Sequence, residues 1–169
     1  MTSYLRAETL KGDASRGHAL FTTNCAVCHQ FRGEGGQIGP DITDVRNKPW
    51  QALLSDILDP NRMVEARWTA HSLTRKTGPA LLGVIEAETA DSITIKGLGV
   101  HETVSRSEVA SIKDLGQSLM PVGFEGSLDH QAMADLLASV TISATATSSL
   151  FGRKHRTAPP ISIRWRRRE

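Results

Sequence analysis

The stretch that decides the fold is residues 13–42, which read DASRGHALFTTNCAVCHQFRGEGGQIGPDI. Its first part predicts a helix over 13–30, because Asp13 can accept hydrogen bonds from the free N–H groups of a first helical turn. Apolar or thiol side chains recur there at three- and four-residue steps, which places them on one helix face: Leu20, Phe21, Cys25 and Cys28. The second part, 31–43, has four glycines ahead of Pro40 and therefore predicts a loop.

Both cysteines of the 169-residue chain lie in one pentapeptide, Cys25-Ala26-Val27-Cys28-His29. This spacing is the attachment signature of c-type haem, since two thiols one helical turn apart can each add to one vinyl group of a single porphyrin. The adjacent histidine can then donate a ring nitrogen to the iron. Two other interpretations stay open. A redox dithiol would need a preceding strand, whereas this pair ends a helix, and a zinc site would need two further ligands from scattered histidines.

In the rest of the chain, the spacing of the apolar residues changes twice between helical and strand-like periods. A second helix is predicted over 49–58, ended by Asp59-Pro60. From about Trp68 the pattern becomes β-branched runs between turn signals, which predicts four or five antiparallel strands that include 81–85, 92–96 and 102–105. A last helix follows an Asp129 N-cap and has its apolar positions at helical spacing: Met133, Leu136, Leu137 and Val140.

The composition is that of an ordinary globular chain, 39% hydrophobic and 22% charged. No apolar run approaches the roughly 20 residues of a membrane helix, and the N-terminus lacks the apolar segment of a signal peptide. The net charge is +2, but 153–169 holds seven basic residues and one acidic, which leaves 13 basic against 17 acidic elsewhere. We expect 141–169 to be a disordered basic tail. Because most such tails are solvated charge runs, we expect no nucleic-acid partner.

The residues around the pentapeptide resemble the class I cytochromes c. Gly17 and Phe21 precede Cys25 by eight and four residues, as in the N-terminal helix of that family. Gly39-Pro40-Asp41-Ile42 matches the family's loop after the haem motif, in which the proline carbonyl accepts the other ring N–H of the haem histidine. Ser118-Leu119-Met120-Pro121, followed by a capped helix, matches the methionine-ligand loop.

The resemblance implies that His29 and Met120 are the two axial ligands of the iron. Other candidates for the sixth position are His71, His101 and, less suited because it follows a helix stop, Met63. Phe21 and Ile42 are apolar enough to wall a haem pocket, although a plain core would use them equally well. Ser139 departs from the family, which usually has an aromatic residue there.

Ninety-one positions separate His29 from Met120, too many for a small cytochrome c. Removing 67–115 leaves a plausible interval, so we expect a mainly α cytochrome c fold, α+β overall. It would be split into 12–66 and 116–140, with 67–115 as a small inserted antiparallel β-module. This arrangement resembles a bacterial subfamily of haem-binding domains with a β insertion between the CXXCH motif and the axial-methionine loop.

These features imply an electron-transfer protein rather than an enzyme, with one covalent haem c and a dehydrogenase domain or partner protein as electron donor. The alternatives are a haem-based sensor with a labile sixth ligand, and a binding module built around a vestigial cytochrome. Covalent haem attachment implies a periplasmic or other extracytoplasmic location, and the missing signal segment suits a domain taken from a longer chain. Exposed strand edges in the β-module could pair between chains and form an oligomer.

Overall fold

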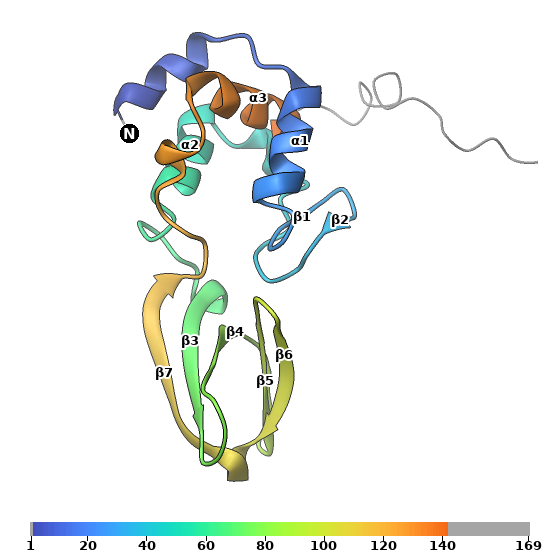
Figure 1. Ribbon diagram of the computed structural model, residues 1–169, viewed down its shortest axis with the longest axis vertical. Helices are drawn as coiled ribbons and strands as arrows, with labels where there is room; N and C mark the ends of the chain where they lie inside the picture. The colour runs from blue at the N-terminus through green and yellow to red at the C-terminus, as the bar shows by residue number, and fades with distance from the viewer. Residues whose placement is uncertain (1, 142–169) are drawn as a thin grey trace, which may run out of the picture.

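The structure, a computed structural model, describes residues 2–141. Helices gather at one end of the molecule and an antiparallel sheet forms the other (Figure 1). The main helices are α1 (Ala14–Asn24), α2 (Trp50–Leu58) and α3 (His130–Thr141). Short 3-10 helices are η1 (Thr2–Thr9), η2 (Val45–Asn47), η3 (Ala66–Trp68), η4 (Arg106–Glu108) and η5 (Phe124–Gly126). The strands are β1 (Gln30–Phe31), β2 (Glu34–Gly35), β3 (Thr69–Arg75), β4 (Leu81–Glu88), β5 (Ser92–Gly97), β6 (Val100–Ser105) and β7 (Val109–Ser118).

The expectation of a mainly α fold is wrong. Within the described part of the chain, about 36% of residues are helical and 30% lie in strands. The sheet has five strands, within the four or five expected, but strand residues are nearly as frequent in the described chain as helical ones. The helices are also short, and much of the chain between them is turn and loop.

Helices α1 and α3 pack at very short range. Asp13 caps α1 as predicted and accepts from the N–H groups of Ser15 and Arg16. A Cβ atom at Gly17 would lie 1.9 Å from the Asp135 carbonyl oxygen and 2.9 Å from the Ser139 Cβ, so only glycine allows this approach. The small side chain at 139 faces the glycine directly, and its hydroxyl donates to the Leu136 carbonyl at 2.7 Å.

A buried carboxylate fastens the same two helices. Asp135 is 3% exposed and accepts from the Asp13 N–H at 2.7 Å and from the Arg16 guanidinium at 2.7 and 3.0 Å. Gln131 donates to it as well, at 2.9 Å. Its hydrogen bonds, above all that with Arg16, lower the pKa of Asp135 below its usual value. The carboxylate therefore stays charged and ties the start of α1 to the middle of α3.

The helical end has one apolar core. All four apolar positions predicted for the last helix are buried in it: Met133, Leu136, Leu137 and Val140. Helix η1, which the sequence did not reveal, adds Tyr4 to this core, and the Tyr4 hydroxyl donates to the Leu128 and Glu125 carbonyls. Helix α1 ends at Asn24, earlier than predicted. The Ala26 N–H donates to the Phe21 carbonyl, five residues back, and this wider turn interrupts the α-helical hydrogen-bond pattern.

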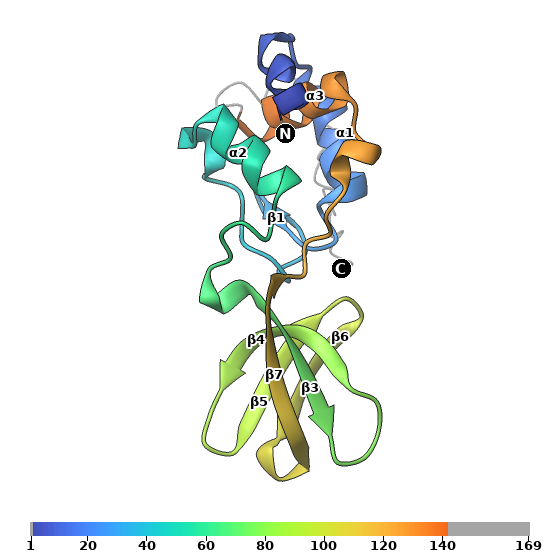
Figure 2. The same cartoon turned by 90° about the vertical axis from the view of Figure 1, so that its left-hand side faces the viewer.

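The other end of the molecule is a five-stranded antiparallel sheet (Figure 2), and its strands follow the order β6-β5-β4-β3-β7 (Figure 1). It encloses a second apolar cluster formed by Leu73, Leu81, Ile93, Ile95 and Val104. The turns between β3 and β4, β4 and β5, and β5 and β6 fall where glycine, proline and aspartate predicted them, whereas the turn formed by η4 between β6 and β7 was not predicted. Thr69, the first residue of the sheet, pairs with Ser118, the last. The chain therefore enters and leaves the sheet at neighbouring positions.

None of the described helices is long and apolar enough to cross a membrane. The expected disordered tail begins within α3, whose last residue is Thr141, and its remaining part, 142–169, lies outside the described residues.

Candidate functional site

Both cysteines lie on the turn that follows α1. The Cys28 and His29 N–H groups donate to the Cys25 carbonyl at 3.0 and 2.9 Å, so the pentapeptide winds through one more near-helical turn. Both thiols are free and half-buried. One turn of backbone thus presents two unpaired thiols and an imidazole.

The glycine-rich loop folds back onto this turn. The Gly36 N–H donates to the Ala26 carbonyl at 2.7 Å. A Cβ atom at Gly35 would lie 2.2 Å from the His29 carbonyl oxygen, and one at Gly36 would lie 2.4 Å from the Val27 carbonyl oxygen. At these two positions glycine is needed because the backbones approach each other closely.

The His29 ring is held in a defined orientation. Its Nδ1 lies 2.8 Å from the Pro40 carbonyl oxygen, which can only accept, so Nδ1 carries the proton. A Cβ atom at Gly39 would lie 2.8 Å from Cε1 of the ring, and the Gly39 N–H is fixed on the Cys28 carbonyl at 2.8 Å. No hydrogen bond within 2–141 occupies the His29 Nε2, whose lone pair remains available to a metal.

The protonation of the thiols differs from that of a redox dithiol. Burial raises the pKa of the Cys25 thiol to about 11, with a smaller contribution from the Cys28 thiol beside it. Burial also raises the pKa of Cys28. Catalytic dithiols have lowered pKa values because cations or helix N-termini stabilise the thiolate, whereas these cysteines follow the C-terminal end of a helix.

A zinc site fits no better. Within residues 2–141, no group of three or more His, Cys, Asp or Glu side chains could hold a metal ion. A structural zinc needs four such ligands. The donor set at this turn is therefore one imidazole nitrogen and two thiols, which suits a group that brings its own equatorial ligands.

Apolar side chains surround the turn. Phe21 is fully buried, and its ring meets that of Phe31 edge-on with centroids 5.5 Å apart. Cys25 and Ile42 pack against the same cluster, as do Trp50 and Phe124, and Leu54 lies within it. The oriented imidazole, the paired thiols and this apolar wall together fit a haem c.

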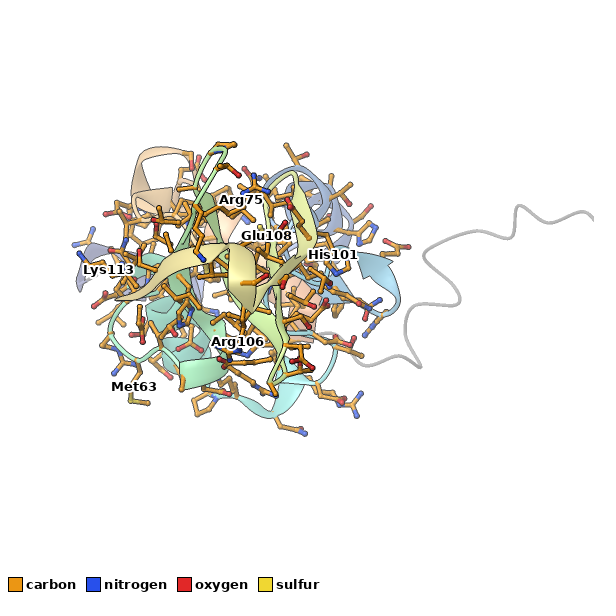
Figure 3. All side chains as sticks on the ribbon, turned by 90° about the horizontal axis from the view of Figure 1, so that it is seen from below. Met63, Arg75, His101, Arg106, Glu108 and Lys113 are labelled. Atoms are coloured by element: carbon orange, nitrogen blue, oxygen red, sulfur yellow. The ribbon has the colours of Figure 1, made fainter. Side chains whose placement is uncertain are left out.

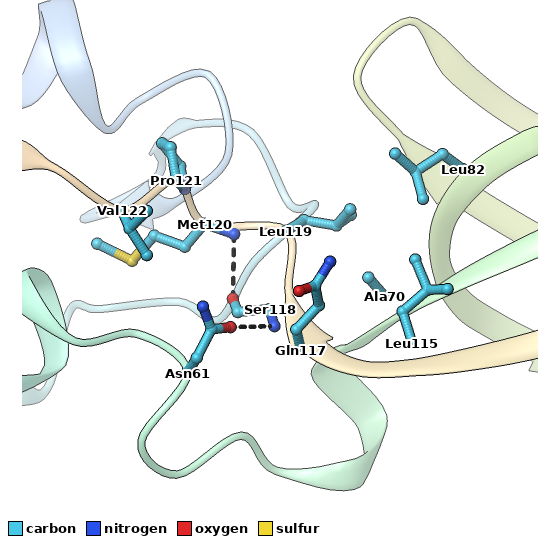
Figure 4. A pocket seen from close by; sticks show the side chains of 10 residues that line it. All are labelled: Asn61, Ala70, Leu82, Leu115, Gln117, Ser118, Leu119, Met120, Pro121 and Val122. Carbon is cyan, nitrogen blue, oxygen red and sulfur yellow. Dashed lines mark hydrogen bonds between the residues drawn. The ribbon is translucent and has the colours of Figure 1, made fainter.

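Met120 lies on a different loop, two residues after β7. In Figure 1 this loop descends on the left, whereas the cysteine turn and its glycine loop lie on the right. The Met120 N–H donates to the Ser118 Oγ at 3.0 Å, and the Ser118 N–H donates to the Asn61 Oδ1 at 2.8 Å (Figure 4). No hydrogen bond within the described chain joins Met120 to His29. A pocket of about 300 Å³ lies beside this loop, lined by Asn61, Ala70, Leu82, Leu115 and 117–122.

The other candidates for the sixth position have different surroundings. His101 lies on the exposed face of β6, where its Nε2 is 2.6 Å from a Glu86 carboxylate oxygen. The Nδ1 of His71, on β3, is 2.9 Å from the Thr69 carbonyl oxygen of the same strand. Met63 projects outward at the rim of the molecule and is 83% exposed (Figure 3).

Sequence reasoning missed the part played by Asn61 and Ser118. Asn61 lies in a turn after α2 and Ser118 ends β7, and nothing in a single sequence pairs residues so far apart. The run Asp59-Pro60-Asn61 indicated only a helix stop. A register prediction for β7 would have been needed to bring the two together.

Comparison with known proteins gives partial matches to cytochromes c. The family model "Cytochrome c" matches residues 14–92. A cytochrome c-553-like protein of Synechocystis sp. is 49% identical over 43 residues, which are 25% of this chain and 40% of that protein. Cytochrome c of Arabidopsis thaliana is 51% identical over 35 residues, 20% of this chain and 31% of that protein. Cytochrome c of Cochliobolus lunatus is 32% identical over 65 residues, 37% of this chain and 60% of that protein.

The chain thus spans less than two thirds of the length of these relatives, and the family match ends at the start of β5, before Met120. All of these matches are to cytochromes c, and the family match includes α1, the cysteine turn and the glycine loop. Together with the geometry of that turn, they support a class I-like cytochrome c.

Proposed function

We propose that this chain carries one haem c, bound through Cys25 and Cys28 with His29 as axial ligand, and that it acts in electron transfer. The hydrogen bond from the His29 Nδ1 to the Pro40 carbonyl supports this most directly, since it presents Nε2 from the same turn as two free thiols. Each thiol would add S–H across one vinyl double bond, with sulfur on one carbon and hydrogen on the other. When bound, the haem iron supplies the one-electron change between ferrous and ferric states.

Met120 is the sixth ligand in this proposal. It lies in a loop before Pro121, and the start of this loop is fixed because Ser118 is hydrogen-bonded both to Asn61 and to the Met120 N–H. A thioether in this position closes the coordination sphere, so the protein needs no nucleophile, base or substrate pocket. It is an electron carrier or an electron-transfer module of a larger dehydrogenase, not an enzyme by itself.

The sheet is proposed to be an insertion, 67–115, in a cytochrome c formed by 12–66 and 116–140. Two observations support this division. The helical end and the sheet have separate apolar clusters, and the pairing of Thr69 with Ser118 brings the two ends of the sheet segment together. Strands β6 and β7 are the sheet edges and offer one route to an oligomer.

The electron donor is proposed to be a dehydrogenase domain or partner protein in the periplasm or another extracytoplasmic space. Thioether formation requires reduced thiols and haem at the same place, and dedicated attachment systems operate on exported chains. The raised pKa values of both thiols agree with cysteines that need such a system rather than reacting spontaneously.

The test is expression with a haem-attachment system, followed by a denaturing gel that detects porphyrin bound to the chain. Wild-type protein should retain porphyrin, and so should the control Val27→Ala, which alters an exposed side chain of the same turn. Cys25→Ala and Cys28→Ala should each weaken attachment, and the double variant should abolish it. A wild-type chain free of porphyrin would overturn the proposal.

The absorbance band for sulfur-to-iron charge transfer then tests the sixth ligand. Met120→Ala should remove this band, and its persistence would assign the ligand elsewhere. Rapid conversion of the reduced wild type by carbon monoxide would favour the sensor, because a closed electron carrier exchanges its ligand slowly.

A further inference from the structure

Two connections join the sheet to the helical end, and one hydrogen bond ties them together. The first runs from α2 to η3 and contains Asn61; the second begins at Ser118, the last residue of β7. The Ser118 N–H donates to the Asn61 Oδ1 at 2.8 Å. We call the pair Asn61 and Ser118, with the hydrogen bond that joins them, the neck clasp.

The clasp continues into the methionine loop. The Ser118 hydroxyl accepts from the Met120 N–H at 3.0 Å, so a chain of two hydrogen bonds leads from Asn61 to the backbone of Met120. Figure 4 shows the Asn61 side chain reaching up from its own loop toward Ser118, with Met120 directly beyond. These two hydrogen bonds therefore connect the backbone of Met120 both to the end of the sheet and to the segment after α2.

Packing holds this loop poorly. Leu119, Met120 and Pro121 border the pocket of about 300 Å³ instead of a filled core, and Val122 is 66% exposed. A loop that borders an open groove can shift without losing many contacts, because few protein atoms oppose it on that side. The position of the Met120 backbone therefore depends on hydrogen bonds more than on side-chain packing.

We propose that Asn61 and Ser118 are positioning residues that hold Met120 in place as a ligand and couple its retention on the iron to the sheet. This inference rests on the proposed function, specifically on Met120 as sixth ligand. A net contribution of about 1 kcal/mol from each hydrogen bond would correspond to about a fivefold change in the equilibrium between bound and released thioether.

The experiment uses the haem-loaded chain and five variants. Asn61→Ala removes the acceptor, whereas Asn61→Asp keeps an oxygen for the Ser118 N–H. Ser118→Ala removes the hydroxyl, whereas Ser118→Thr keeps it. Gln117→Ala is the matched control, because Gln117 is an exposed neighbour that lines the same pocket and makes no side-chain hydrogen bond within the described chain.

Three measurements separate positioning from general stability. Carbon monoxide should bind ferrous Asn61→Ala and Ser118→Ala about fivefold faster than wild type, and within about twofold of wild type in the two conservative variants and the control. When the pH is raised stepwise, the charge-transfer band should disappear at a lower pH in the two alanine variants than in wild type. Amide hydrogen exchange should quicken at Ser118 in Asn61→Ala and at Met120 in Ser118→Ala.

The results distinguish a failure of the clasp inference from a failure of the ligand assignment. If Met120→Ala loses the band while the two alanine variants match the control, the clasp does not position the ligand and only this inference is wrong. If Met120→Ala keeps the band, Met120 is not the ligand, and both the ligand assignment and the clasp inference are overturned. Persistence of covalent porphyrin in every one of these variants would leave the haem c proposal intact.

Discussion

Replacing Gly39 by alanine should loosen the His29 ring without straining the backbone. The added Cβ would lie 2.8 Å from the ring Cε1 and 3.1 Å from Nδ1, whereas ordinary contact begins near 3.4 Å. The loop cannot easily retreat, because the Ile38 and Gly39 N–H groups both donate to the Cys28 carbonyl, at 3.0 and 2.8 Å. The ring must therefore move away from its present position by about 0.6 Å to relieve the overlap.

That movement lengthens a short hydrogen bond. The Nδ1 to Pro40 oxygen distance of 2.8 Å would approach about 3.4 Å, beyond the usual range for N–H···O. Overpacking together with the loss of this bond should cost about 1–3 kcal/mol in the free energy of unfolding. In haem-loaded protein the imidazole also becomes a weaker electron donor, so the reduction potential should rise.

Urea unfolding followed by circular dichroism and redox titration of the haem-loaded protein measure the two effects. Gly126→Ala is the control, since a Cβ there has nothing within 4 Å and its φ is not positive. A Gly39→Ala protein with the stability and potential of the Gly126→Ala protein would refute the reasoning about the ring.

Three further predictions concern the packing. Asp135→Asn should reduce the loss of stability at acid pH. The hydrogen bond with Arg16 holds the pKa of Asp135 below its usual value of 3.8. The ionised carboxylate therefore stabilises the wild type above that pH, and this stabilisation is lost as the pH falls through the lowered pKa. Denaturation at a series of pH values checks this, and parallel curves for both proteins would contradict it. Gly17→Ala should destabilise the protein by about 3 kcal/mol or more in urea, because its Cβ would overlap a helix carbonyl; loss below about 1 kcal/mol would show that the helices can separate. Leu73→Ala should cost about 2–5 kcal/mol and Leu82→Ala well under half as much, because the first side chain is fully buried and the second is 51% exposed; equal thermal shifts would disprove the sheet core.

The haem turn could be predicted from the sequence because its information is local. Cys25, Cys28 and His29 are close in sequence, and the glycines that cover them follow within a few residues. The caps Asp13 and Asp129 likewise act on the next turn of the chain, and both accept hydrogen bonds from helical N–H groups. Period and capping therefore identified the three main helices, and the β-branched runs identified β4, β5 and β6; strands β1 and β2 lie where a helix end and a loop were predicted.

What escaped prediction depends on distant partners. Helix η1 has no clear apolar period of its own and is fixed by Tyr4 reaching the carbonyls before α3. Strand β7 carries exposed residues through most of its length, so alternation could not reveal it. The length of this last strand, and with it the share of strand in the chain, was underestimated for this reason.

The pairing of Thr69 with Ser118 has a consequence for the order of folding. Asp13 and Asp135 bond across 122 residues, a long loop to close, whereas the sheet grows from hairpins between neighbouring strands. Once the sheet has formed, its ends lie together and the loop left to close is shorter by 49 residues, which lowers the closure entropy by about 0.5 kcal/mol. Early formation of the sheet would thus let α1 meet α3 almost as if the strands were absent, so slow or faulty sheet formation should delay assembly of the helical end.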